Sequence, residues 1–335
     1  MSPTQGDVMS VTLALGTTGQ IDRAGWRKTS FALPFRLGDL RLFTATFQGL
    51  TCDQHFTQRP QESVVLARLK ELSVDAEVLL LRSQPVTGTL KRFEVDDYHI
   101  RYVSHVYRRF GVDLTRSFEA YLQHFSPKTR STFRRKLRKF KNFSGGTIVW
   151  QEFRAPEDMA LFYEAARTVS RKTYQENLFN LGLPRSERFQ RGLIRRASQD
   201  LIRAYVLFHK DTPVSYLFCT VFDDILMYEY LGYDHKYEKW SPGTLLQYLV
   251  LEHLCQSGKY RLFDFGEGEA PHKQFFSTQH LRCADIYYFR RSWRNFLMLS
   301  LHAGIDMLSH GIGKGLSLIR AKDSLKKAVR RWACT

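Results

Sequence analysis

The pattern of hydrophobic and polar positions along the chain predicts short strands mixed with amphipathic helices. Apolar residues alternate with polar ones in SVTLALG (10–16) and RLFTATFQGL (41–50), as is typical of strands. Residues 60–72 have helical spacing, and the apolar run AEVLLLRSQ (76–84) predicts a strand buried on both faces. With one more strand expected at 98–107, the first part of the chain is predicted to be mixed α/β.

From residue 126 the pattern predicts a longer and more regular order of elements. A helix is expected to begin at Ser126-Pro127 and to bury Phe133, Leu137 and Phe140, with basic residues around the rest of its circumference. The elements that follow are, in order, a strand at 147–153, two helices beginning near 156 and 186, three strands at 202–210, 214–222 and 225–233, a helix at 243–258, a strand at 261–265, a helix at 271–276 and a strand at 284–289. Because the turns between the three strands are so short, these strands are expected to form an antiparallel meander.

The positive charge is concentrated in two segments. The chain has 335 residues and a formal net charge of +17. Residues 128–141 hold eight Lys/Arg and no acid, residues 290–335 hold ten Lys/Arg and two Asp, and the remainder is nearly neutral. We therefore expect a neutral globular body with two basic elements that face an anionic partner.

Several classes of protein are disfavoured by the composition. No run of 18 apolar residues predicts a membrane-spanning helix, and the first residues do not have the pattern of a signal peptide. The five cysteines are scattered without a CxxC pair, and the histidines form no HExxH motif, so no metal site is expected. These features favour a cytoplasmic location.

Several short motifs, in this order of elements, resemble those of the GNAT acyltransferases. More narrowly, they resemble the FemAB-like branch with a BioF2-like or cellulose-biosynthesis-protein-like domain. The matching text is SPKTR (126–130) leading into RRKLR (134–138), SPGTLL (241–246), and FDFGEG (263–268) with Lys273 and Phe276; in the first half it is GLTCD (49–53). The resemblance implies a tandem GNAT-like α/β (α+β) fold. Its expected parts are a degenerate half at 1–120, a complete acyltransferase domain at 121–290 and a basic amphipathic tail at 291–335.

The loop before the helix at 243–258 decides which donor the resemblance implies. GNAT enzymes that bind coenzyme A usually carry a glycine-rich loop here, and this chain has Trp240, Ser241, Pro242, Gly243 and Thr244, with one glycine. The first N–H groups of the helix can still hold a phosphate. Acetyl-CoA or a longer acyl-CoA is therefore the implied co-substrate, and an acyl carrier protein or an aminoacyl-tRNA remains an alternative.

Acyl transfer to an amine requires an uncharged amine, donors for the oxyanion and a route for protons. Lys273 stands where the FemAB-like pattern has a lysine, which is implied to stabilise the oxyanion or orient the donor. Asp264, at the end of a predicted buried strand, could position the acceptor amine or only cap the next turn. Glu267 in that turn could bind substrate or be a solvated acid. Glu229 could be a base with a raised pKa among its apolar neighbours, or a carboxylate on the exposed face of its strand.

The two basic segments allow two interpretations each. Arg134 and Arg138 could bind phosphates of tRNA, a nucleotide-linked sugar or a lipid headgroup, or belong to the solvated face of an amphipathic helix. In the tail, Trp293, Leu297, Leu301 and Leu308 lie along one side, which favours contact with an anionic membrane at its inner face over a closing helix packed on the domain.

The sequence thus predicts an N-acyltransferase that uses a thioester donor and an amine acceptor in the synthesis of a cell-envelope component, an exopolysaccharide or a lipid. One alternative is an aminoacyl-tRNA-dependent transferase. The other is a non-catalytic protein that binds polyanions or membranes on a GNAT scaffold.

Overall fold

The computed structural model describes residues 27–37, 40–53, 77–173 and 182–309, which form two compact units. The first unit is Tyr107–Leu281, and the second joins the described residues before Tyr107 to those from Arg282 onward. Strands β5 (His99–Asp113) and β11 (Gln279–Arg290) each contribute residues to both units. The strand expected at 10–16, the helix expected at 60–72 and the end of the tail lie outside the described residues.

The first unit contains a mixed sheet whose strands are in the order β5-β10-β9-β8-β7-β6. Its strands are β6 (Val149–Phe153), β7 (Ile202–His209), β8 (Thr212–Phe222), β9 (Ile225–Tyr233), β10 (Leu262–Asp264) and the end of β5. β7, β8 and β9 pair antiparallel, which confirms the predicted meander. β10 is parallel to β9 and antiparallel to β5.

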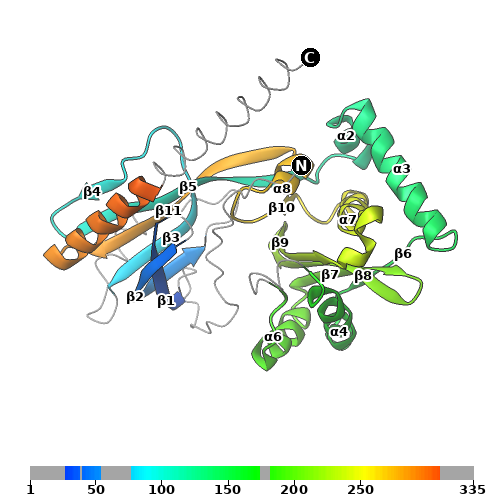
Figure 1. Ribbon diagram of the computed structural model, residues 1–335, viewed down its shortest axis with the longest axis horizontal. Coiled ribbons are helices and arrows are strands. Elements are labelled where there is room, and N and C mark those ends of the chain that lie inside the picture. The colour runs from blue at the N-terminus through cyan, green and yellow to red at the C-terminus, as the bar shows by residue number, and fades with distance from the viewer. Residues whose placement is uncertain (1–26, 38–39, 54–76, 174–181, 310–335) are drawn as a thin grey trace, which may run out of the picture. The chain divides into compact units, whose positions relative to one another are not determined.

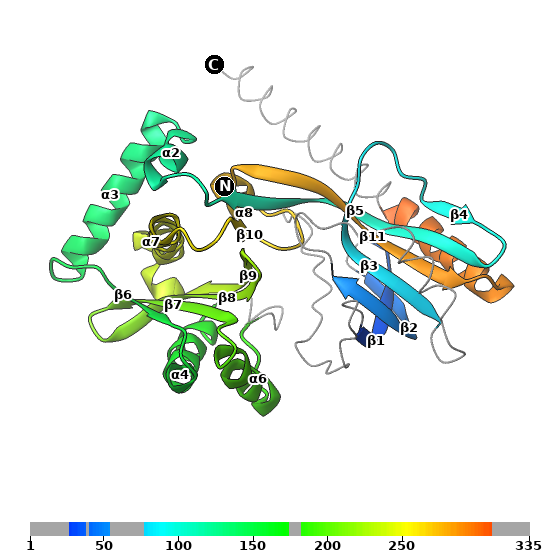
Figure 2. The ribbon, with the colours of Figure 1, turned by 180° about the vertical axis from the view of Figure 1, so that it is seen from behind.

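Helices cover both faces of this sheet (Figures 1 and 2). On one face lie α2 (Phe118–Gln123), α3 (Pro127–Phe143) and α7 (Pro242–Ser257); on the other lie α4 (Met159–Ser170) and α6 (Glu187–Ala197). Because side chains alternate along a strand, Tyr205 and Leu207 of β7 pack with α7, whereas Ala204 and Val206 pack with α4 and α6. Burial on both faces explains why these strands are almost continuously apolar.

The basic helix α3 forms where it was predicted. Ser126 caps it by accepting a hydrogen bond from the Thr129 N–H, and Pro127 occupies its first turn. Phe133 and Phe140 are buried against the sheet core, and Leu137 packs beside them. A narrow row of apolar side chains therefore packs α3 on the sheet, and the basic residues lie on the other sides of the helix.

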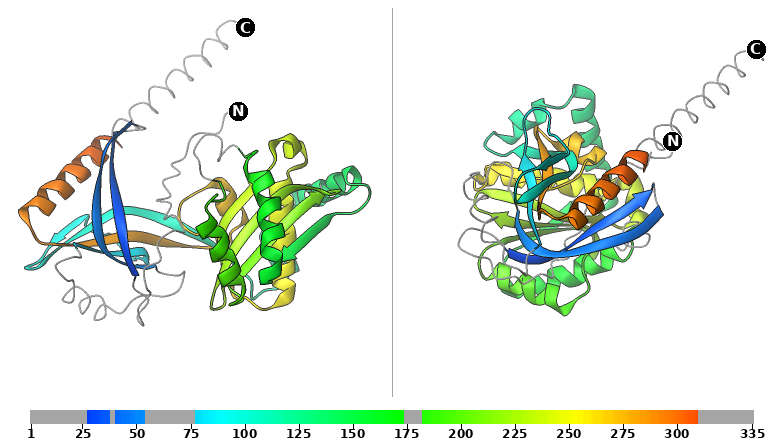
Figure 3. Two further views of the ribbon diagram at one scale, coloured as in Figure 1. Left: turned by 90° about the horizontal axis from the view of Figure 1, so that it is seen from below. Right: turned by 90° about the vertical axis from the view of Figure 1, so that its left-hand side faces the viewer.

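The second unit is also built from a sheet and a helix (Figure 3). Its strands are β1 (Arg27–Leu37), β2 (Leu40–Asp53), β3 (Val78–Pro85), β4 (Phe93–Val95), the start of β5 and the end of β11. The helical residues 293–309 pack on it through Leu299 and Ala303, which join a core that includes Phe35, Tyr102 and Phe289. Sheets with helices in both units confirm the predicted mixed α/β class. Within the described residues, no helix is both long and apolar enough to cross a membrane.

Candidate functional site

The candidate site lies where β9 and β10 stop pairing. The last pair is Asp264 with Met227, and β10 ends there whereas β9 continues to Tyr233. The register between β9 and β8 shifts at the same level, since Phe218 of β8 pairs with Tyr230 and the next residue, Cys219, pairs with Tyr228. Glu229 is thus an extra residue in β9, and such bulges are common beside functional sites.

A buried ion pair closes the end of β10. Asp264 is fully buried, and its two carboxylate oxygens lie 3.0 Å from Nε and 2.7 Å from an Nη of Arg109 on β5. The Gly266 N–H also donates to Asp264, at 2.8 Å. Burial of the guanidinium is costly, and the nearby Asp264 carboxylate nonetheless holds the pKa of Arg109 above its ordinary value. Asp264 therefore helps to fix the turn after β10.

The turn that follows places Lys273 beside this pair. Lys273 lies in the short helix α8 (Pro271–Phe276), and its Nζ donates to the backbone carbonyl of Glu267 at 2.5 Å. Burial lowers the pKa of Lys273 to about 8, against the opposing attraction of Asp264 and Glu267. The ammonium form of Lys273 is therefore less favoured here than it would be in water.

Arg108, the neighbour of Arg109, contacts the same turn at a second point, Glu269. Its guanidinium and backbone N–H both bond to the Glu269 carboxylate, with distances of 2.9 to 3.3 Å. The turn after β10 is therefore held at Asp264 and at Glu269 by two consecutive residues of β5. Sequence reasoning did not identify these two arginines, and the available signal was an Arg-Arg pair inside an apolar strand.

Glu229 lies on β9 in a different setting. Its side chain is exposed and accepts a hydrogen bond from Thr220 Oγ1 at 2.9 Å. Its neighbours are enclosed: burial raises the pKa of Tyr230 to about 12 and raises that of Tyr228 as well. The Tyr228 ring lies 6.2 Å from the ring of His272 in α8, so β9 and α8 are close at the level of the bulge.

The predicted donor loop leads directly into α7. Ser241 adopts the left-handed conformation with φ 55° and ψ 50°, which is uncommon for a residue other than glycine. Its side chain does not cap the helix, and among the described residues the N–H groups of Gly243 and Thr244 have no hydrogen-bond partner. A side chain at Gly243 would lie 3.3 Å from Leu231 and Tyr233 of β9, so glycine allows α7 to begin close to β9.

Trp240 packs this loop against α3. Its ring stacks on Phe143 of α3 at 3.7 Å, and the Lys239 ammonium lies 4.1 Å from its centre. Lys139 of α3 also donates to the backbone carbonyl of Lys239. The start of α7 is thereby fastened to the end of α3, which favours a packing role for Trp240.

The structure brings some of the predicted residues together and leaves others apart. Asp264, Glu267 and Lys273 form one cluster after β10, whereas Glu229 sits on the bulge of β9. Arg134 and Arg138 are exposed on α3 and are not part of that cluster.

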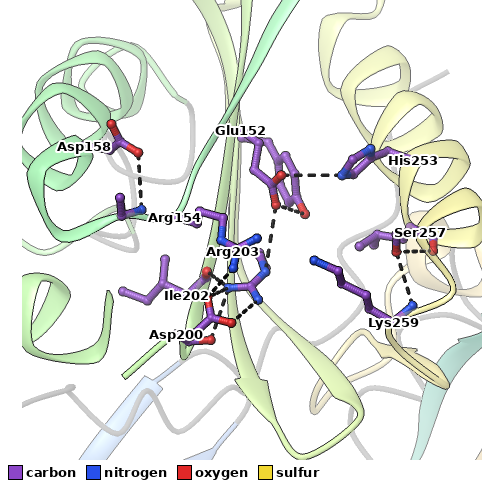
Figure 4. Close-up of polar contacts among 12 residues, drawn as sticks. Glu152, Arg154, Asp158, Asp200, Ile202, Arg203, His253, Ser257 and Lys259 are labelled. Carbon is purple, nitrogen blue, oxygen red and sulfur yellow. Dashed lines mark hydrogen bonds and ion pairs between the residues drawn. The ribbon is translucent and has the colours of Figure 1, made fainter. Parts of the chain in front are cut away.

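A second polar cluster joins β6, β7 and α7 (Figure 4). Glu152 accepts a hydrogen bond from the Tyr205 hydroxyl and lies 3.5 Å from the His253 ring. Arg203, which is almost fully buried, pairs with Asp200 at 2.8 Å and lies 3.9 Å from Glu152. The hydrogen bonds from Arg203 lower the pKa of Asp200, and every strong contact of the cluster is internal to the unit. We therefore regard it as structural.

Comparisons with known proteins point to one kind of fold. Residues 127–274 match the model of an acetyltransferase (GNAT) domain. Among solved structures, FemX is similar, with a TM-score of 0.52 and 10% identity over 82% of this chain and 90% of its own. The C-terminal domain of a putative lysylphosphatidylglycerol synthetase from Agrobacterium fabrum has a TM-score of 0.49 and 12% identity, over 84% and 90% of the two chains.

A tandem GNAT protein from the clavulanic acid biosynthesis pathway is a further similar structure, with a TM-score of 0.39 and 13% identity over 79% of this chain and 83% of its own. A search of curated protein sequences found no match. Because the aligned part of FemX extends well beyond residues 127–274, the likeness concerns the fold of both units and confirms the predicted FemAB-like architecture.

Proposed function

We propose that this chain, whose residues 127–274 match the model of an acetyltransferase (GNAT) domain, is an N-acyltransferase that moves an acetyl or longer acyl group from a thioester to an amine. The observation that carries the proposal is the separation of β9 from β10 next to Lys273. The open edge of β9 offers backbone N–H groups and Lys273 offers a positive charge, and together they can stabilise a carbonyl oxygen that gains negative charge during the reaction.

In the proposed mechanism, the acyl carbonyl lies along β9 beyond Met227, where backbone N–H groups donate to its oxygen. The neutral acceptor amine attacks the carbonyl carbon, and Lys273 in its ammonium form stabilises the oxyanion. The thiolate then leaves as the carbonyl re-forms, and the amine loses a proton. Glu229 is the proposed acceptor of that proton. Asp264 acts as a positioning residue, because Arg109 and Gly266 already bind its oxygens.

We propose acyl-CoA as the donor because the start of α7 offers a phosphate the N–H groups of Gly243 and Thr244, which have no partner in the described part of the chain. Ser241, Gly243 and Thr244 would contact it, while Pro242 shapes the first turn and Trp240 holds the loop in place. Glu267 would face the acceptor. The acceptor itself is proposed to be an amine of a cell-envelope, exopolysaccharide or lipid precursor handled in the cytoplasm, by analogy with the FemAB-like branch.

Calorimetry and turnover test this proposal. Acetyl-CoA and longer acyl-CoAs are titrated into the protein, and acyl transfer to a panel of primary amines is followed by release of free thiol. Lys273→Ala should lower kcat by about 10²–10³ while acyl-CoA still binds, since the loss of one oxyanion donor typically costs that much. Lys259→Ala removes an exposed lysine as the matched control and should change nothing. Failure of every acyl-CoA to bind would exclude the coenzyme A version.

The second candidate is an aminoacyl-tRNA-dependent transferase, with an acyl carrier protein as a third type of carrier. The tRNA-dependent reaction is favoured by the eight basic residues of α3 and by the single glycine of the donor loop. Under this alternative, acyl-CoA does not bind, and neutralising Arg134 and Arg138 weakens RNA binding. A protein that binds RNA or membranes but transfers no acyl group would instead be a binding module on a GNAT scaffold.

A further inference from the structure

Helix 293–309 presents two unlike faces. It begins after Ser292, whose hydroxyl caps it by accepting from the Asn295 N–H. One face is packed on the second unit: Leu299 is fully buried, His302 bonds to the Tyr102 hydroxyl at 2.5 Å, and Asp306 pairs with Arg92 at 2.6 Å. These contacts fix the rotation of the helix about its axis.

The opposite face is apolar and exposed. A helix turns about 100° per residue, so Trp293, Leu297, Leu301 and Leu308 fall within a narrow arc nearly opposite the packed face. Their exposed fractions are 76%, 61%, 49% and 64%. We call these four residues the apolar stripe. Phe296 and Met307 flank it and are also more than half exposed. A row of large apolar side chains in water is unfavourable unless something covers it.

The charges around the apolar stripe indicate what covers it. Arg290, Arg291 and Arg294 are exposed at its N-terminal end. In the sequence, residues 310–335 follow the stripe and add seven Lys/Arg and one Asp. A second copy of the chain docked on the stripe would bring Arg290, Arg291 and Arg294 close to a surface of the same charge. An anionic bilayer meets the apolar side chains with its acyl region and the arginines with its headgroups.

We propose that the apolar stripe of helix 293–309 is a membrane-docking surface that lies in the interface of an anionic bilayer. Tryptophan and leucine enter the headgroup–acyl boundary, and the flanking arginines bind the headgroup phosphates. The packed face, with Leu299, His302 and Asp306, stays on the second unit, so docking needs no rearrangement of the protein. The proposal concerns where the protein acts and does not depend on acyl transfer.

Vesicle co-sedimentation of the full chain tests the proposal. Wild type should bind phosphatidylglycerol vesicles much more strongly than phosphatidylcholine vesicles. Leu297→Glu with Leu301→Glu should weaken binding by at least about tenfold, because each leucine loses the favourable transfer from water. Leu161→Glu with Ile194→Glu is the matched control, since these residues are 63% and 50% exposed on helices of the other unit. That control should bind like wild type.

A charge variant separates the two contributions. Arg294→Gln should weaken binding to phosphatidylglycerol by about fivefold and leave the weak binding to phosphatidylcholine unchanged. Circular dichroism and thermal unfolding of each variant establish that it is folded. Equal binding by the stripe variant and its control would overturn the proposal, as would the absence of wild-type binding to either vesicle. A dimer in sedimentation velocity that only the stripe variant abolishes would assign the surface to a second copy instead.

Discussion

At the scale of single residues, the organising feature of the candidate site is the buried pair of Arg109 and Asp264. Each partner is almost completely enclosed, with side-chain exposures of 4% and 0%. Such a pair adds little net stability compared with apolar residues, but removal of one partner leaves an uncompensated charge in the interior. Its main effect is to fix the position of the turn that carries Lys273.

Asp264→Ala should therefore lower the free energy of unfolding by about 3–5 kcal/mol, because Arg109 would stay buried without its carboxylate. Urea unfolding followed by fluorescence measures the change. The control is Glu269→Ala, which removes the exposed partner of Arg108 and should cost no more than about 1 kcal/mol. Replacing both buried partners, with Asp264→Leu and Arg109→Met, should recover much of the loss. Equal costs at Asp264 and Glu269 would contradict the buried-pair interpretation.

Lys273 should give the reaction a characteristic pH dependence. Its pKa is lowered to about 8, so the ammonium form proposed to bind the oxyanion is present below that pH and lost above it. The kcat of acyl transfer should fall as pH rises through about 8. Lys273→Arg keeps its charge to much higher pH, so this fall should disappear, whereas Lys259→Arg should leave the wild-type profile. If kcat of Lys273→Arg still falls as pH rises through this range, the pH dependence belongs to a group other than Lys273.

The acids and the lysine proposed for the site could be grouped from the sequence, but the arginines beside them could not. Asp264, Glu267 and Lys273 could be grouped because they lie within ten positions of one another after a predicted strand. Arg109 pairs with Asp264 across 155 positions, and no local pattern records so distant a contact. The bulge at Glu229 is equally invisible, because it exists only in the register between two strands.

At the scale of secondary-structure elements, the prediction was most successful where local chemistry determines the boundary. The helix expected at 271–276 is α8, Pro271–Phe276, and α3 begins at the predicted Pro127. The strand expected at 284–289 was too short, since β11 runs from Gln279 to Arg290. Its extra residues include polar positions, which hydrophobic pattern alone does not assign to a strand.

Gly243→Ala tests whether the close approach of α7 to β9 matters for donor binding. The added carbon would lie 3.3 Å from the side chains of Leu231 and Tyr233, so these side chains or the first turn of α7 must shift by a few tenths of an ångström. Acyl-CoA affinity should fall several-fold in calorimetry, with little net change in stability, because alanine is favoured over glycine in helices by about 1 kcal/mol. Gly192→Ala in α6, where the new carbon meets nothing within 4 Å, should only stabilise the protein. Unchanged affinity in Gly243→Ala would remove α7 from the donor site.

At the scale of the whole molecule, the dominant property is the uneven charge. Residues 128–141 and 290–335 account for nearly all of the net charge of +17. The two basic elements belong to different units: α3 lies in the unit that contains residues 127–274, which match the GNAT domain model, and helix 293–309 lies in the other unit. Each basic element therefore needs its own experiment, and the test of α3 is the one that bears on the donor.

If α3 binds the phosphates of a tRNA donor, binding of RNA should depend steeply on salt. For single strands, log K falls with log[salt] by about 0.7 for each phosphate contact, so neutralising Arg134, Arg135 and Arg138 should reduce the slope by about 2. The slope is measured by fluorescence anisotropy of a labelled RNA at salt concentrations from about 50 to about 300 mM.

The matched control neutralises three exposed arginines of another helix, Arg188, Arg191 and Arg195 of α6. If both triple variants lose the same slope, the charge acts through the general field of the protein and α3 is not the RNA site. If the α3 variant alone loses it while acyl-CoA fails to bind, the tRNA-dependent reaction replaces the coenzyme A version. If neither variant changes the slope and acyl-CoA binds, the basic side of α3 is only a solvated face, and the donor is held by the start of α7.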